Sequence, residues 1–157
     1  MAGSSTASEP AARAFRFDLA DPLAYLEAER LRAEDPAVEW IPVLAPPAYR
    51  CAEEIETVRE DVRRGAEALG LQAVRWPEPF PFDSSRAMLV ATYAKQVGRA
   101  VAFGIAAFRQ AYAAGRPLDV DDNILIAAAA CEMHPRAVLK AMETRGVREA
   151  LEAATAA

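Results

Sequence analysis

The sequence predicts a mostly helical α/β fold in which two short strands and the helix between them precede a series of helices. Residues 15–19 alternate apolar and polar side chains, which is typical of a half-buried strand. Residues 38–44 form a second run of this kind, and the segment between the two has helical spacing. A strand, a helix and a strand within about 30 residues predict a right-handed crossover unit. Beyond residue 51 the apolar side chains recur at intervals of three and four, as in amphipathic helices.

The first helix is expected to begin at Asp21 and Pro22. A carboxylate suits the N-cap position, and the proline ring fits the first helical position. The apolar spacing that follows predicts about three turns. Pro42 lies within the second strand, and because proline has no N–H for a ladder, it confines that strand to an edge or a strand end.

The rest of the chain predicts helices separated by glycine and proline. Helical spacing runs through residues 51–69, and Gly70 ends that helix. Three prolines in residues 76–81 predict an extended connection, after which Asp83 or Ser84 caps the next helix. Further helices are expected after a break near Gly98, from Asp119, from Pro135 and over residues 148–157.

Length and charge restrict the class of protein. The chain has 157 residues, of which 53% are hydrophobic, as expected for one globular domain. It carries 18 Lys and Arg against 23 Asp and Glu, a net charge of −5, so nucleic acid and anionic membranes are not expected as partners. No run of 18 uncharged apolar residues predicts a membrane span, and residues 1–14 lack the apolar core of a secretory signal. We expect a disordered arm at residues 1–14 and a cytoplasmic protein.

The other chemically interesting residues favour structural roles. Cys51 and Cys131 form neither a Cys-x-x-Cys pair nor a zinc cluster; their spacing leaves a long-range disulfide open, but we expect free thiols. His134, before Pro135, favours a helix cap over catalysis. Asp119, Asp121 and Asp122 favour the first turn of a helix over a cation site, so no metal is predicted.

Two further groups of side chains have a structural and a functional interpretation. Arg59, Arg63 and Arg64, among glutamates, favour a solvated helix face with ion pairs. The aromatic side chains in and beside the proline-rich connection favour packing onto the helices, with stacking on an aromatic substrate as the alternative. These aromatic residues are Trp76, Phe80 and Phe82.

Five segments, in order, resemble the DsbA-like branch of the thioredoxin fold, and within it the 2-hydroxychromene-2-carboxylate isomerases and kappa-class glutathione transferases. Each motif is weak alone, and their order and spacing carry the resemblance, which extends from residue 15 to the C-terminus. It implies a partial thioredoxin-like β-α-β unit at residues 15–50 and a DsbA-like helical domain at residues 51–157. The segments are 17–26 (FDLADPLAYL), 38–43 (VEWIPV), 61–71 (DVRRGAEALGL), 80–88 (FPFDSSRAM) and 119–125 (DVDDNIL).

The resemblance places the family's reactive Ser or Cys at Asp21. An ionised carboxylate cannot donate a hydrogen bond to a thiolate, and its charge raises the pKa of a nearby thiol. The family's second reactive position is Ala24, which is inert. We therefore expect no disulfide exchange and altered or lost thiol chemistry.

The family's chain continues beyond the equivalent of Ala157 through a Gly-Val-Pro segment into two strands and a helix. A sheet of only two strands is marginal in water, and its apolar faces favour self-association. We therefore expect a truncated chain, a split gene product, or a fold completed by another copy in a homodimer.

The resemblance implies an isomerase or oxidoreductase that acts on a small organic molecule with glutathione as the possible cofactor. The binding cleft is expected where the helix starts at Asp21 and Asp83 meet, because their N–H groups suit an anion. In catalysis Asp21 would be the general base, its pKa raised by burial against Trp40 or Phe82. The alternative is a non-catalytic binding or assembly module. Residues assigned to substrate or thiol binding are Pro22, Tyr25, Trp40, Asp83 and Ser84.

Overall fold

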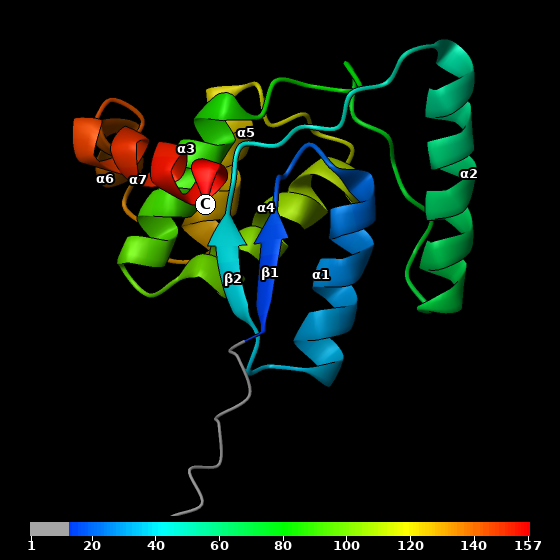
Figure 1. Cartoon of the computed structure of the whole chain (residues 1–157), viewed down its shortest axis with the longest axis horizontal. Helices are drawn as coiled ribbons and strands as arrows, with labels where there is room; N and C mark the ends of the chain where they lie inside the picture. The colour runs from blue at the N-terminus through cyan, green and yellow to red at the C-terminus, as the bar shows by residue number, and fades with distance from the viewer. Residues whose placement is uncertain (1–12) are drawn as a thin grey trace, which may run out of the picture.

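The computed structural model describes residues 13–157, so nearly all of the expected N-terminal arm lies outside the described residues. Within this range the chain is mostly helical, with the strands near its beginning (Figure 1). This confirms the predicted mostly helical α/β fold class. The elements are β1 (Ala14–Phe17), α1 (Pro22–Glu34), β2 (Glu39–Pro42), α2 (Ala52–Ala68), α3 (Ser85–Gln96), α4 (Ala100–Tyr112), α5 (Asp121–Ala130), α6 (Pro135–Ala141) and α7 (Arg145–Ala156).

The two strands form a parallel pair, as the crossover unit predicts. Phe15 lies opposite Trp40, and Phe17 lies opposite Pro42. The strand β2 ends at Pro42, because the proline offers no N–H to continue the ladder. One more backbone bond follows, from the Val43 N–H to the Phe17 carbonyl at 3.0 Å.

Both strands are shorter than the sequence predicts. The strand β1 ends at Phe17 because Asp18 turns the chain: its carboxylate accepts the N–H of Ala20 at 2.8 Å, and its carbonyl accepts the N–H of Asp21 at 3.1 Å. Leu19 is nevertheless completely buried, so its apolar side chain misled the strand prediction.

Two helix starts also differ from the prediction. The helix α5 begins at Asp121, after the extended residue Val120, so Asp119 lies outside it. The helix α7 begins at Arg145, three positions before the start predicted from the Ala- and Glu-rich sequence. The predicted break at Gly98 is confirmed: this glycine has a φ of 77°, the left-handed conformation that ends α3.

Helices cover the sheet on both faces. On one face Trp40 packs edge-on against Phe15 and Phe17, with ring centroids 5.0 and 5.6 Å apart, and α4 passes directly over it. At Gly104 of α4, a Cβ would lie only 2.8 Å from the Trp40 ring, so the close approach requires glycine. On the other face Arg16 donates to the carbonyl of Ala154 at 2.5 Å, so the end of α7 lies over the sheet (Figure 1).

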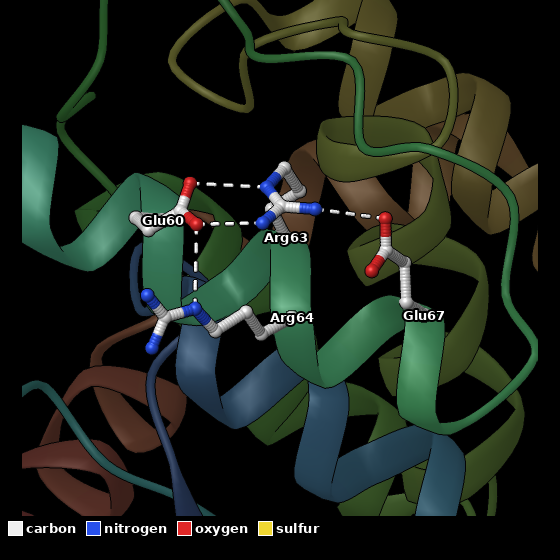
Figure 2. A network of polar contacts seen from close by, with 4 residues as sticks. All are labelled: Glu60, Arg63, Arg64 and Glu67. Atoms are coloured by element: carbon white, nitrogen blue, oxygen red, sulfur yellow. Dashed lines mark hydrogen bonds and ion pairs between the residues drawn. The ribbon is translucent and has the colours of Figure 1, made fainter.

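The helix α2 stands at the side of the molecule, next to α1 (Figure 1). Its inward positions include Val62 and Ala66, which are buried. Its outer face carries a chain of ion pairs in which Glu60 contacts two arginines, Arg63 at 2.6 Å and Arg64 at 3.3 Å (Figure 2). Among residues 13–157, no helix combines the length and the apolar character that a membrane crossing requires.

Candidate functional site

A buried carboxylate, Asp18, holds three segments together at the carboxyl end of β1. One of its oxygens accepts the N–H of Ala20 at 2.8 Å and the hydroxyl of Ser84 at 2.7 Å. The other oxygen accepts the N–H of Ala45 at 2.9 Å. Burial raises the pKa of Asp18 despite these hydrogen bonds, and the nearby charge of Asp21 raises it further. The start of α3 is thereby fixed against the turn that leads into α1.

Asp21 is the N-cap of α1, as the sequence predicts. Its carboxylate accepts the N–H of Leu23 at 3.0 Å, and Pro22 takes the first helical position. The side chain is partly exposed, yet burial raises the pKa of Asp21; the N–H groups of Leu23 and Ala24 oppose this effect. The helix N-terminus therefore already carries a negative group, supplied by the chain itself.

Two tyrosines lie close enough to Asp21 for its charge to act on them. Burial, together with the charge of Asp21, raises the pKa of Tyr49 to about 12. Burial raises the pKa of Tyr112 well above its ordinary value, and the hydroxyl of Tyr112 donates to the Leu19 carbonyl at 3.1 Å. Both phenols are thus neutral at pH 7, beside two carboxylates whose pKa values are raised.

The predicted site residues divide between this corner and other parts of the molecule. Ser84, the N-cap of α3, belongs to the corner through Asp18, whereas Asp83 is exposed and accepts the N–H of Ser85 at 2.9 Å just before the helix. Tyr25 is buried with its ring 5.6 Å from that of Tyr112. The described contacts of Trp40 are those with β1 and α4, away from Asp21.

The aromatic ring that the structure places beside the site is therefore Tyr112. Phe82 is buried, with its ring 6.4 Å from that of Tyr112. Sequence reasoning missed Asp18, Tyr49 and Tyr112 as members of the site. Asp18 had one signal, an acidic residue directly after a strand pattern, whereas Tyr112 was hidden in the apolar stripe of its helix.

A row of aromatic rings leads from Tyr112 toward α2. Trp76 lies 6.1 Å from Tyr112 and 4.8 Å from Phe80, and Phe80 lies 5.9 Å from Tyr49, measured between ring centroids. The predicted packing of the connection onto the rest of the molecule is confirmed. The guanidinium of Arg59 pairs with Glu56 at 3.8 Å but also lies over the Trp76 ring at 4.9 Å, so the prediction of a solvated face with ion pairs is confirmed only in part for this arginine. It holds for Arg63 and Arg64, which pair with Glu60 (Figure 2).

The remaining candidates have structural roles. His134 caps α6 by accepting the N–H of Arg136 at 3.1 Å, and Asp121 pairs with Arg86 at 2.8 Å. Cys51 is exposed and Cys131 is buried, and both are free thiols. Within residues 13–157 no group of three or more His, Cys, Asp or Glu side chains is arranged to hold a metal ion.

Comparisons with known proteins agree with this architecture. The family model of the DSBA-like thioredoxin domain matches residues 25–157. A solved structure, that of a selenomethionine 2-hydroxychromene-2-carboxylate isomerase, superimposes with a TM-score of 0.78 over 90% of this chain and 76% of that chain. Because the two sequences are only 17% identical, the similarity to this isomerase structure shows a shared fold and nothing more. No curated protein matches the sequence. The family match covers most of the chain, which is therefore a member of the DsbA-like thioredoxin domain family.

Proposed function

We propose that the chain is an isomerase-type member of its family, which binds a small organic acid at the N-terminus of α1 and uses Asp21 as a general base. One observation carries the proposal: Asp21 is partly exposed at the start of the helix, and burial raises its pKa. A carboxylate with a raised pKa is a stronger base than an ordinary carboxylate.

Tyr49 supplies the complementary group in this proposal. Its pKa is raised to about 12, so its hydroxyl stays protonated at pH 7 and is a hydrogen-bond donor. In such a reaction the base removes a proton from the substrate, and a nearby hydrogen-bond donor stabilises the oxyanion that develops. Asp18 is not a second base, because both of its oxygens accept hydrogen bonds from within the fold.

Glutathione has a restricted role at such a site. The Asp21 carboxylate takes the position at the helix N-terminus that would stabilise a thiolate, and two anions there repel each other. We therefore propose that any glutathione binds as the neutral thiol and takes part as a ligand or addend. Disulfide exchange is no part of the proposal, because Asp21 and Ala24 stand at the family's two reactive positions.

The test is turnover of 2-hydroxychromene-2-carboxylate, the substrate named in the solved relative, with and without glutathione. We expect Asp21→Asn to lower the rate by about 10²- to 10⁴-fold, the usual contribution of a general base. The control is Asp119→Asn, an exposed carboxylate outside the helices. A wild-type rate in the Asp21→Asn variant would reject the base. Calorimetry separately measures whether glutathione binds saturably, as the proposed role of glutathione requires.

The second candidate function is a non-catalytic binding or assembly module. The sheet favours it: within residues 13–157, β1 pairs only with β2, so one edge of β1 has no strand beside it. In this proposal a second copy covers that edge in a homodimer. Size-exclusion chromatography with light scattering tests it, and a monomer that binds no dye for exposed apolar surface counts against it.

A further inference from the structure

A large open hollow lies at the opposite end of α1 from Asp21. Its volume is about 1190 Å³, and its walls come from the end of α1, the start of β2, α4 and α5. Arg32, in the last turn of α1, is at its rim. Arg32 follows Asp21 by 11 positions, and a helix rises about 1.5 Å per residue, so this part of the hollow lies about 16 Å along α1 from Asp21. The hollow extends along α4 to Ala113 and Ala114, but neither Asp21 nor the Tyr49 and Tyr112 side chains line it, so it is separate from the proposed site.

Most of the surface of this hollow is apolar. Trp40 and Ile105 form part of the wall, and both are largely buried. Val101 and Ile126 also line it, and they are 41% and 48% exposed. A concave apolar wall that also carries exposed aliphatic side chains is typical of a binding site for an apolar ligand.

The charges around the hollow are mostly positive. Two of its four cations are neutralised, because Lys95 pairs with Glu39 at 2.8 Å and Arg109 pairs with Glu29 at 2.7 Å. The other two have no carboxylate partner within residues 13–157. They are Arg99, which donates to the carbonyl of Cys131, and Arg32.

The positive charge at the hollow is local, because the chain as a whole has a net charge of −5. An apolar cavity with uncompensated guanidinium groups favours a ligand that is itself apolar at one end and anionic at the other. We propose that the hollow is a binding site for an amphipathic organic anion, such as a medium-chain carboxylate. The carboxylate binds Arg99, the apolar chain lies against Val101, Ile105 and Ile126, and Arg32 adds attraction from the rim.

Trp40 provides the readout, because it lines the hollow and the chain has only two tryptophans. In a Trp76→Phe background, Trp40 is the only tryptophan left to report. Dodecanoate, titrated below its micelle concentration, is expected to change the Trp40 fluorescence saturably with one site per chain. Dodecanol, which has the same chain without the charge, is expected to bind at least about tenfold more weakly, since a charge-assisted contact is lost.

Variants then separate the charge from the apolar wall. Arg99→Gln should weaken dodecanoate about tenfold and leave dodecanol unchanged, while Arg99→Lys should restore most of the affinity for dodecanoate. Ala102→Phe fills the hollow and should abolish binding, whereas its matched control is Ala153→Phe, at an exposed position of α7 outside the hollow.

Three results would overturn the proposal: equal affinities for dodecanoate and dodecanol, unchanged binding in Ala102→Phe, or no saturable binding. A further overturning result comes from sedimentation, where a dimer that Ala102→Phe dissociates would make the hollow an interface between copies. Asp21→Asn should leave the dodecanoate affinity at its wild-type value. If the protein does not turn over 2-hydroxychromene-2-carboxylate but binds dodecanoate, only the proposed function is rejected. If it turns over that substrate but does not bind dodecanoate, only the binding site proposed for the hollow is rejected.

Discussion

The hydroxyl of Ser84 donates a 2.7 Å hydrogen bond to the carboxylate of Asp18, 66 positions earlier in the chain, and both side chains are buried. The bond joins the first residue of the turn after β1 to the N-cap of α3. It lets the helical part of the chain fix the position of the turn that carries Asp21.

Ser84→Ala removes this donor and leaves a buried carboxylate oxygen with one partner fewer. We expect a loss of about 1.5–3 kcal/mol in the free energy of unfolding, the usual range for a hydrogen bond to a charged group. Urea denaturation at pH 7 measures it. The neighbouring Ser85→Ala, at the half-buried first residue of α3, leaves the Asp18 bond intact and should cost far less; equal losses would show that the Asp18 bond adds nothing.

The stability of the fold should depend on pH with opposite signs at two aspartates. Burial raises the pKa of Asp21, so its contribution to stability is fully present below its unfolded pKa and is lost as the pH rises through the folded pKa. Arg86 lowers the pKa of Asp121, so that contribution is present above the unfolded pKa and is lost as the pH falls through the folded pKa.

Asn replacements test these signs, because asparagine keeps the cap at position 21 but cannot ionise. Relative to wild type, Asp21→Asn should become more stable between pH 3 and pH 7, whereas Asp121→Asn should become less stable over the same range. Thermal unfolding followed by circular dichroism at several pH values measures both. Parallel pH profiles for the two variants would contradict the assignment.

Gly104→Ala should destabilise the fold through the sheet face that α4 covers. The new methyl group would meet the Trp40 ring at 2.8 Å, and overpacking of this kind costs about 1–3 kcal/mol. Gly146→Ala is the matched change, because the added Cβ at position 146 has no atom within 4 Å. It should be neutral or stabilise α7 by up to about 1 kcal/mol. If both substitutions have the same effect in urea denaturation, the contact with Trp40 does not limit position 104.

The helix α2 should open before the rest of the molecule. It packs beside α1 at the edge of the fold, and its outer face depends on exposed ion pairs such as those of Glu60 (Figure 2). Amide hydrogen exchange read by mass spectrometry should therefore label α2 earlier than α4, and 1 M salt should widen the difference by screening the pairs. Equal protection of the two helices would show that α2 belongs to the cooperative core.

The sequence predicts those features of the fold that depend on local chemistry. Asp21 and Pro22 mark the start of α1, Pro42 ends β2 and Gly98 ends α3, because caps and chain breakers act through their own backbone. The fold class followed from the same local patterns, and the family resemblance added the arrangement of the helical part.

Features that depend on distant partners could not be predicted in this way. Asp18 also accepts hydrogen bonds from Ser84 and Ala45, which fix the turn after β1 in place and which no local pattern reveals. Arg59 looked like its neighbours on α2, and only the three-dimensional fold brings Trp76 beneath it. The candidate site shows the same division: Asp21 was found from its position before a helix, whereas Tyr112 was not, because its partner is the carbonyl of Leu19.

The bonds that hold the first strand and its turn also determine when this part of the molecule can be completed during synthesis. Arg16 can donate to the Ala154 carbonyl only after 138 more residues have been made. The Leu19 carbonyl can accept from the Tyr112 hydroxyl only after 93 more. At about 5–20 residues per second, a ribosome needs roughly 8–30 s to make these 157 residues. Until Phe108 has been made, the nascent strand lacks the α4 ring that packs against Phe17, with ring centroids 5.7 Å apart in the folded protein. Expression at lower temperature or with added chaperones should therefore raise the yield of folded protein.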